Sequence, residues 1–138
     1  MITLYQAQAT ASGGRNGQVA SSDGILQLPL SLPKSLGGPG KAATNPEQLF
    51  AAGYAACFDS ALAFVANKQS LKLSGTSVQA TVRIGPREGG GFALAVQLGV
   101  TVPGVSQELA QQLIEQAHQV CPYSNALRGN VPVTLTLI

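Results

Sequence analysis

A long apolar segment, residues 45–68, restricts the fold of this chain more than any other feature. Its first residues carry the signals of a helix N-terminus. Asn45 is a favourable N-cap, Pro46 suits the first helical position, and Gln48 lies where a capping-box partner would be. The sequence therefore predicts one long helix that starts directly after Asn45.

The body of this helix is apolar on nearly all sides. Between residues 49 and 66, the only strongly polar side chains are Asp59 and Ser60. A helix of this kind is buried in a core or a subunit interface, or it spans a membrane. Its length suits a bilayer, but it is rich in Ala and Gly and places a charge near its centre, which is costly in lipid. We therefore expect a core helix and no membrane span.

The composition indicates one domain, residues 1–138, with few surface charges. Only 10% of the residues are charged, whereas ~25% is usual in soluble domains. This low charge content suggests that part of the surface is covered in an oligomer. The net charge of +2 comes without a basic run, which argues against nucleic acid as a partner. The N-terminus lacks a basic segment followed by an apolar run, so we expect no signal peptide and a cytoplasmic protein.

Alternating apolar residues and turn signals predict antiparallel strands on both sides of the central helix. A loop dense in Gly and Pro, residues 31–44, precedes that helix. Ser106 can cap a second helix, and Pro122 can open a short third one. The fold class is therefore α+β, with two main helices covering the strands. Strands are expected over 2–9, 18–22, 25–30, 78–84, 92–102 and 131–137.

Cys57, in the middle of the central helix, is the first candidate for chemistry. A cysteine in an apolar helix is usually a small, inert core residue. Burial raises the pKa of a thiol, and even at the ordinary value of ~8.5 little thiolate forms at neutral pH. A nucleophilic Cys57 would therefore need a nearby cation, and Arg15, in the Gly-rich turn 13–17, is the best candidate.

Glu47, in the first helical turn, is the second candidate. About three turns of helix, ~15 Å of rise, separate it from Cys57, so the two side chains cannot touch on one straight helix. For Glu47 to serve the site of Cys57, the helix must break or a second copy of the chain must supply the carboxylate. Otherwise, Glu47 is only a first-turn charge that suits the helix dipole.

Cys121, just before Pro122, leaves several interpretations open. It can be an N-cap, where a thiolate is favoured, or the partner of Cys57 in a reversible disulfide. A metal site formed by both cysteines, His118 and Glu47 is conceivable, but the paired C-x-x-C spacing of such sites is missing. We therefore expect no metal.

Four segments together resemble the organic hydroperoxide resistance proteins, the Ohr branch of the OsmC/Ohr superfamily. The resemblance covers essentially the whole chain, and one small departure is Lys41-Ala42-Ala43 in place of a shorter Gly-rich stretch. It implies an intertwined homodimer with its sites at the interface. The segments are GGRNG at 13–17, LGGPG at 36–40, TNPEQLFAAGYAACF at 44–58 and VCPYSNALRGN at 120–130.

The resemblance also implies a thiol peroxidase that protects against oxidative stress. Cys57 would attack a hydroperoxide and become a sulfenic acid, and Cys121 would then form a disulfide with it. Arg15 would stabilise the thiolate, and Glu47 would hold Arg15 in place. No cofactor would be bound, and a lipoyl dithiol, dihydrolipoamide or a lipoylated protein, would be the reductant.

An apolar pocket would favour fatty-acid and alkyl hydroperoxides over hydrogen peroxide. Phe50, Tyr54 and Phe64 are the candidates for its lining. The alternative function is a non-enzymatic dimer that binds an apolar ligand in the same pocket, with both cysteines inert.

Overall fold

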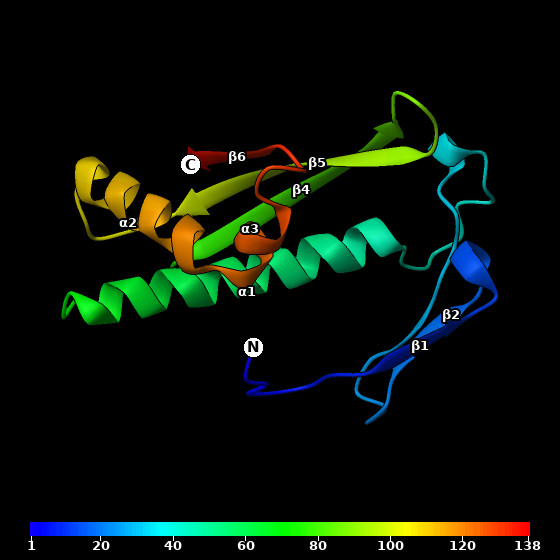
Figure 1. Ribbon diagram of the computed structural model, residues 1–138, viewed down its shortest axis with the longest axis horizontal. Helices are drawn as coiled ribbons and strands as arrows, with labels where there is room; N and C mark the ends of the chain where they lie inside the picture. Colours follow the sequence, from blue (N-terminus) through cyan, green and yellow to red (C-terminus); the bar gives the residue numbers. More distant parts are fainter. The chain divides into compact units, whose positions relative to one another are not determined.

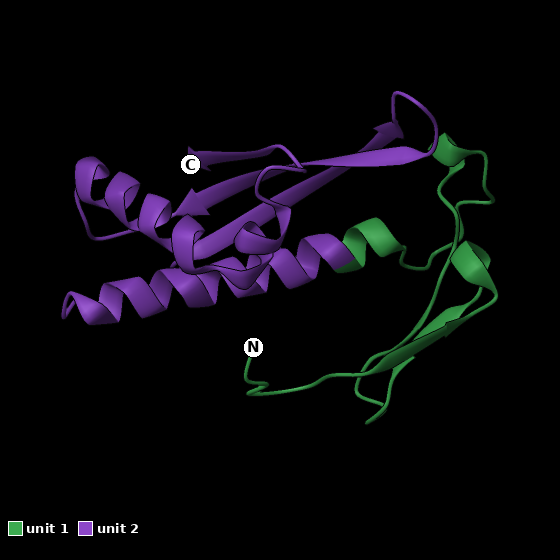
Figure 2. Cartoon of the chain, viewed as in Figure 1, with its two compact units in different colours: residues 1–49 green, residues 50–138 purple.

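The computed structural model describes residues 1–138 and divides the chain into two compact units, 1–49 and 50–138 (Figure 2). Each unit is described by itself below. The expected single domain stays a prediction.

The first unit is built on a small antiparallel sheet with the strand order β1-β2-β3 (Figure 1). Its strands are short, and most of their side chains are exposed. The loop before the long helix contains a further 3-10 turn, η2. The elements are β1 Ala9–Ser12, η1 Gly14–Asn16, β2 Gln18–Ser21, β3 Gln27–Pro29 and η2 Lys34–Leu36.

An Asp-Gly pair forms the turn between β2 and β3. Asp23 Oδ1 accepts a hydrogen bond from the Ile25 N–H at 3.1 Å, and Gly24 takes a positive φ of 76°. The strand predicted over residues 2–9 is wrong, because β1 begins only at Ala9 and the preceding residues are exposed and outside any strand. Alternation alone does not form a strand where no partner strand lies alongside.

The second unit packs helices on a three-stranded sheet with the order β4-β5-β6. The sheet is mixed, because β4 and β5 are antiparallel whereas β5 and β6 are parallel. The expectation of antiparallel strands throughout is therefore wrong for β6. The elements are β4 Ser77–Pro86, β5 Phe92–Thr101, α2 Gln107–Val120, α3 Pro122–Leu127 and β6 Val133–Leu137.

The helix α1, Pro46–Lys68, begins in the first unit (Figure 2) and supplies much of the core of the second. By length and composition alone α1 could cross a membrane, a test that core helices of soluble proteins also pass. One face packs into the core, where the fully buried side chains include Phe58 and Leu62 of α1, Leu98 of β5 and Leu113 of α2. The core-helix prediction is confirmed.

The predicted helix caps are present. Asn45 Oδ1 accepts from the Gln48 N–H at 2.8 Å, and Ser106 Oγ accepts from the Leu109 N–H at 3.1 Å. The Gln48 side chain differs from a capping box, because its Oε1 accepts from the Thr44 hydroxyl at 2.8 Å.

Candidate active site

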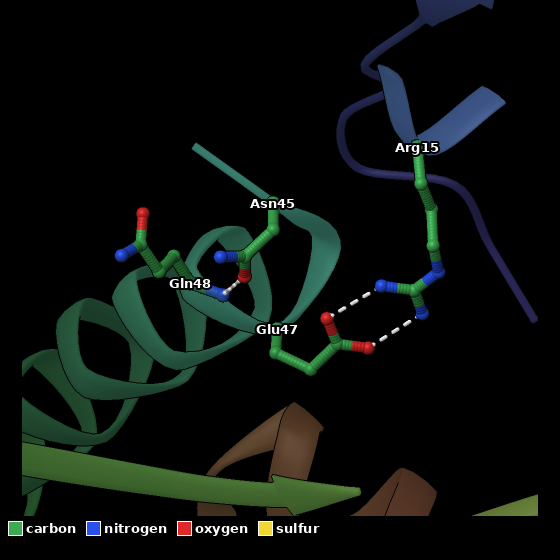
Figure 3. A network of polar contacts seen from close by, with 4 residues as sticks. All are labelled: Arg15, Asn45, Glu47 and Gln48. Atoms are coloured by element: carbon green, nitrogen blue, oxygen red, sulfur yellow. Dashed lines mark hydrogen bonds and ion pairs between the residues drawn. The ribbon is translucent and has the colours of Figure 1, made fainter. Parts of the chain in front are cut away.

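Arg15 and Glu47 form a bidentate ion pair in the first unit (Figure 3). Arg15 Nη1 donates to Glu47 Oε2 at 2.7 Å, and Nη2 donates to Oε1 at 2.6 Å. This hydrogen-bonded pairing lowers the pKa of Glu47 and raises that of Arg15, so both groups stay charged at neutral pH. The pair leaves the remaining guanidinium N–H groups of Arg15 free for another anion.

The glycines around Arg15 explain how η1 presents it. Gly13 and Gly14 have φ values of 77° and 60°, a region that favours glycine. A Cβ on Gly17 would lie 1.7 Å from the Ser12 carbonyl oxygen, so no other residue fits this turn. The GGRNG segment therefore fixes the backbone from which Arg15 reaches the start of α1.

The two cysteines lie together in the second unit. Cys57, on α1, is half-buried, whereas Cys121, between α2 and α3, is fully buried. Both thiols are free, and their Sγ atoms are 3.6 Å apart. A disulfide needs ~2.05 Å, so a shift of about 1.5 Å would join them.

The surroundings of Cys57 keep it a thiol. Burial raises its pKa above the ordinary value, although the Tyr123 backbone N–H, which bonds its sulfur, acts in the opposite direction. The second unit therefore brings the sulfurs together without supplying a charge that ionises Cys57.

An apolar hollow of about 350 Å³ opens beside Cys57. Phe64, 50% exposed, is part of its wall, and Lys68 Nζ lies 4.7 Å from the Phe64 ring centroid. The hollow is lined by Cys57, Ser60, Ala61, Phe64, Val120 and Pro122.

The other two predicted lining residues lie elsewhere. Tyr54 is fully buried, and Phe50 and Tyr54 pack edge-on, with ring centroids 6.3 Å apart. Both rings also pack on Tyr123, at 6.0 and 5.7 Å. This position does not fit the prediction that Phe50 and Tyr54 line the pocket, because neither borders the hollow.

A family model described as OsmC-like protein matches residues 38–136. This chain belongs to the OsmC-like protein family. An organic hydroperoxide resistance protein of Xanthomonas axonopodis pv. citri is 56% identical over 97% of this chain and 94% of its own length. The protein OhrB of Bacillus subtilis, also named as an organic hydroperoxide resistance protein, is 44% identical over 99% of both chains.

Solved structures of OsmC-like proteins share the α+β fold. An organic hydroperoxide resistance protein of Elizabethkingia anophelis has a TM-score of 0.95 at 56% identity, covering 99% of this chain and 98% of its own. A putative one from Vibrio cholerae, with captopril in one of its active sites, has a TM-score of 0.94 at 54% identity, covering 99% and 94%. The expected OsmC/Ohr-like fold is confirmed.

Ser124 is a buried polar residue of this OsmC-like chain that sequence reasoning did not single out. Its Oγ lies 2.7 Å from the Tyr54 hydroxyl and 2.8 Å from His118 Nδ1. A serine in a short polar segment gives no signal by itself. The one available hint was spacing, since His118 precedes Cys121 by three residues and Ser124 follows it by three.

The structure pairs the predicted residues two by two. Arg15 meets Glu47, and Cys57 meets Cys121. The helix α1 is unbroken from Pro46 to Lys68, so ~15 Å of helical rise separates Glu47 from Cys57 within one chain. That a second copy of this OsmC-like chain supplies the Glu47 carboxylate to the site of Cys57 stays a prediction. No group of three or more His, Cys, Asp or Glu side chains lies together in the structure.

Proposed function

We propose that this protein is a thiol-dependent peroxidase that reduces organic hydroperoxides to alcohols. The observation that supports this most directly is the 3.6 Å separation of the Cys57 and Cys121 sulfurs beside an apolar hollow. Cys57 is the more accessible thiol of the two and borders the hollow, as a nucleophile must. The names of the relatives, organic hydroperoxide resistance proteins, point to the same substrate class.

The reaction proceeds in two steps on the sulfurs. The Cys57 thiolate attacks one peroxide oxygen, the O–O bond breaks, and the departing alkoxide takes up a proton to leave as the alcohol. Cys57 is then a sulfenic acid. The Cys121 sulfur attacks Cys57 Sγ, and the sulfenic hydroxyl leaves with the Cys121 proton as water, so a disulfide remains.

Arg15 supplies the positive charge that Cys57 lacks within its own unit. The guanidinium is held by Glu47 and still carries free N–H groups, which suit a thiolate or the developing charge on a peroxide oxygen. An opposite charge within about 4–6 Å lowers a pKa by ~1–3 units, which acts against the effect of burial on Cys57. A homodimer in which the partner completes the site agrees with the distance along α1.

The apolar hollow and the burial of Cys121 support the substrate class and the reductant that we propose. Apolar walls favour alkyl and fatty-acid hydroperoxides, which gain from leaving water. A dithiol reductant, for which we propose a lipoyl group, attacks the more accessible Cys57 sulfur and releases the buried Cys121 as a thiol. The reaction needs no bound cofactor, and it suits the cytoplasm, where thiols are kept reduced.

The test is a single-turnover reaction of the reduced protein with one equivalent of cumene hydroperoxide. We expect both free thiols to disappear and the intact mass to fall by two hydrogens, with dihydrolipoamide restoring both thiols. Survival of both thiols would overturn the peroxidase and favour a non-enzymatic apolar-ligand-binding protein. In that case the hollow should bind the alcohol, cumyl alcohol, in a calorimetric titration.

A further inference from the structure

Cys121 is the joint between two helices. It is both the C-cap of α2 and the N-cap of α3, and its backbone is extended, with φ −63° and ψ 122°. The position of its sulfur therefore depends on how α3 is held against α2. A joint of this kind needs a further contact to fix its angle, because two helices that meet at one extended residue can pivot there.

A hydrogen bond between two side chains connects α2 to α3 across Cys121. His118 Nδ1, in the last turn of α2, lies 2.8 Å from Ser124 Oγ in the first turn of α3. Arg128 adds a second tie, because its Nη2 donates to the His118 carbonyl oxygen at 2.7 Å. Cys121 lies midway between His118 and Ser124 in the sequence, so the His118–Ser124 hydrogen bond joins the residues on either side of this cysteine.

The same serine ties the joint to the helix that carries Cys57. The Tyr54 hydroxyl lies 2.7 Å from Ser124 Oγ, and Tyr54 precedes Cys57 by three residues on the same face of α1. Tyr54 and Ser124 are both fully buried. The two sulfurs are thus flanked by a chain of hydrogen bonds that joins the same two elements.

The direction of this chain depends on the charge of His118. With a neutral ring that carries its proton on Nε2, Nδ1 accepts from Ser124, and Ser124 can then accept from Tyr54, so every hydroxyl proton has an acceptor. A charged ring must donate from Nδ1, so the Ser124 proton loses that nitrogen as its acceptor. Between Ser124 and Tyr54 only one hydroxyl can then donate to the other, so one of the two hydroxyl protons has no acceptor among these groups, and Ser124 is the one hydrogen-bond partner of Tyr54 in the structure. Such a loss is costly for a buried group.

The groups around His118 favour the neutral ring. Burial and the Arg128 charge both lower the pKa of His118. Ser124 and, beyond it, Tyr54 face it from the other elements. Glu115, on the same helix, is exposed and accepts from Gln111 at 3.0 Å.

We propose that Tyr54, Ser124 and His118 are positioning residues that hold the Cys121 sulfur against Cys57 and set the rate of disulfide formation. This role rests on the proposed peroxidase and concerns its second step. Peroxide attack by Cys57 depends on α3 only through the Tyr123 backbone N–H that bonds its sulfur, whereas disulfide formation needs the Cys121 sulfur itself in place, so the second step should respond more strongly to these residues.

The test follows both steps with cumene hydroperoxide and traps the sulfenic acid with dimedone. In Tyr54→Phe, which removes one buried hydrogen bond, sulfenic acid should form close to the wild-type rate but convert to disulfide about tenfold more slowly. Ser124→Ala removes the bonds to both Tyr54 and His118, so its conversion should be slowed at least as much. Thr76→Val is the matched control, because the Thr76 hydroxyl donates to Asp59 at 2.8 Å on another face of the same helix α1 and is not part of the Tyr54–Ser124–His118 chain. It should leave the conversion unchanged.

Two substitutions of His118 separate positioning from a general loss of structure. His118→Asn keeps an acceptor near the place of Nδ1 and removes the titration of the ring, so its conversion should stay near the wild-type rate and lose the part of its pH dependence that comes from His118. His118→Ala should be slow at all pH values. In the wild type, conversion should slow as the pH falls through the lowered pKa of His118, which lies below the ordinary value of ~6.5, because the ring then takes up a proton.

A second measurement tests the geometry without peroxide. In a glutathione buffer, two molecules of glutathione form as glutathione disulfide oxidises the two thiols, so the equilibrium reports how well the sulfurs are placed. Ser124→Ala should lower the equilibrium constant about tenfold, and Thr76→Val should not.

The outcomes separate the two proposals. If the thiols of the wild-type protein do not react with cumene hydroperoxide, the proposed peroxidase activity is refuted. The glutathione equilibrium would still decide the positioning role. Wild-type conversion and equilibrium in Ser124→Ala and Tyr54→Phe would refute positioning alone. An equal slowing in Thr76→Val would also refute it, because any weakened contact of α1 would then have the same effect.

Discussion

The two paired arrangements in this chain are built in opposite ways. Arg15 and Glu47 are both charged, and their side chains are 36% and 16% exposed. Cys57 is half-buried and Cys121 fully buried, and hydrogen bonds among Tyr54, Ser124 and His118 join the elements that carry them. Cys57, the nucleophile of the proposed peroxidase, therefore lies where burial disfavours an anion, whereas Arg15 lies where water still supports charge. On that proposal, reactivity depends on a cation from outside the second unit.

Cys57→Ser should have the largest effect on activity. A hydroxyl in the same apolar setting cannot ionise near neutral pH, so turnover of cumene hydroperoxide with dihydrolipoamide should fall to background. Cys121→Ser should still consume one equivalent of peroxide and stop at a Cys57 sulfenic acid, visible as a mass increase of one oxygen. Rapid loss of both peroxide and thiol in Cys57→Ser would show that Cys121 is the nucleophile.

Arg15→Ala should have the next largest effect, because it removes the charge and leaves the burial of Cys57. We expect the pKa of Cys57 to rise and the second-order rate with cumene hydroperoxide at pH 7 to fall about tenfold or more. The thiolate absorbance near 240 nm, followed against pH, measures the pKa of Cys57. If the pKa of Cys57 in Arg15→Ala equals that of the wild type, Arg15 is not the cation that lowers it.

A control for this substitution lies elsewhere in the chain. Arg87, in the turn between β4 and β5, has no ion-pair partner. Arg87→Ala removes the same charge from the protein and should leave both the titration and the rate unchanged.

The sequence predicted best those elements whose local signals were consistent. The helix over 46–68, the β4–β5 hairpin and α2 each combined clear caps or turns with a strong apolar pattern. Residues 2–9 alternate too, but alternation does not say whether a partner strand is present. The parallel pairing of β6 was missed for a related reason, since an alternating pattern carries no direction.

The candidate site was predictable to different depths. The Arg15–Glu47 pair and the Cys57–Cys121 pair were both named, because charged residues and cysteines stand out in an apolar chain. Ser124 was not, since its importance comes from burial between three helices. Tyr54 was assigned to the pocket by its position on α1, whereas tertiary packing turns it toward Ser124.

Phe64→Ala should affect selectivity more than chemistry. Phe64 lines the hollow beside Cys57, and the buried area it offers a bulky substrate is worth ~1.5–3 kcal/mol at most. We expect kcat/KM for cumene hydroperoxide to fall about tenfold while the rate with hydrogen peroxide changes little. Phe92→Ala is the control, because Phe92 is 74% exposed and does not line the hollow. An equal fall with both peroxides would mean that Phe64 supports Cys57 rather than the substrate.

Glu47→Gln should have the smallest effect on stability, and its pH dependence identifies the cause. The pKa of Glu47 is lowered by Arg15, so the folded state binds its proton less readily than the unfolded state. The stabilisation is therefore present above the ordinary value of ~4.5 and is lost as the pH falls through the lowered pKa.

Because the pair is partly exposed, we expect the difference between wild type and Glu47→Gln to be about 1 kcal/mol or less at pH 7. Urea unfolding at pH 7 and pH 3 measures it, and the difference should shrink at the lower pH. Glu108→Gln removes a first-turn carboxylate of α2 that has no ion-pair partner, so it isolates the contribution of the helix dipole. If both substitutions cost the same at pH 7, Arg15 adds nothing to the folded state. Its guanidinium would then be held in place for an anion that binds there, rather than for the stability of the fold.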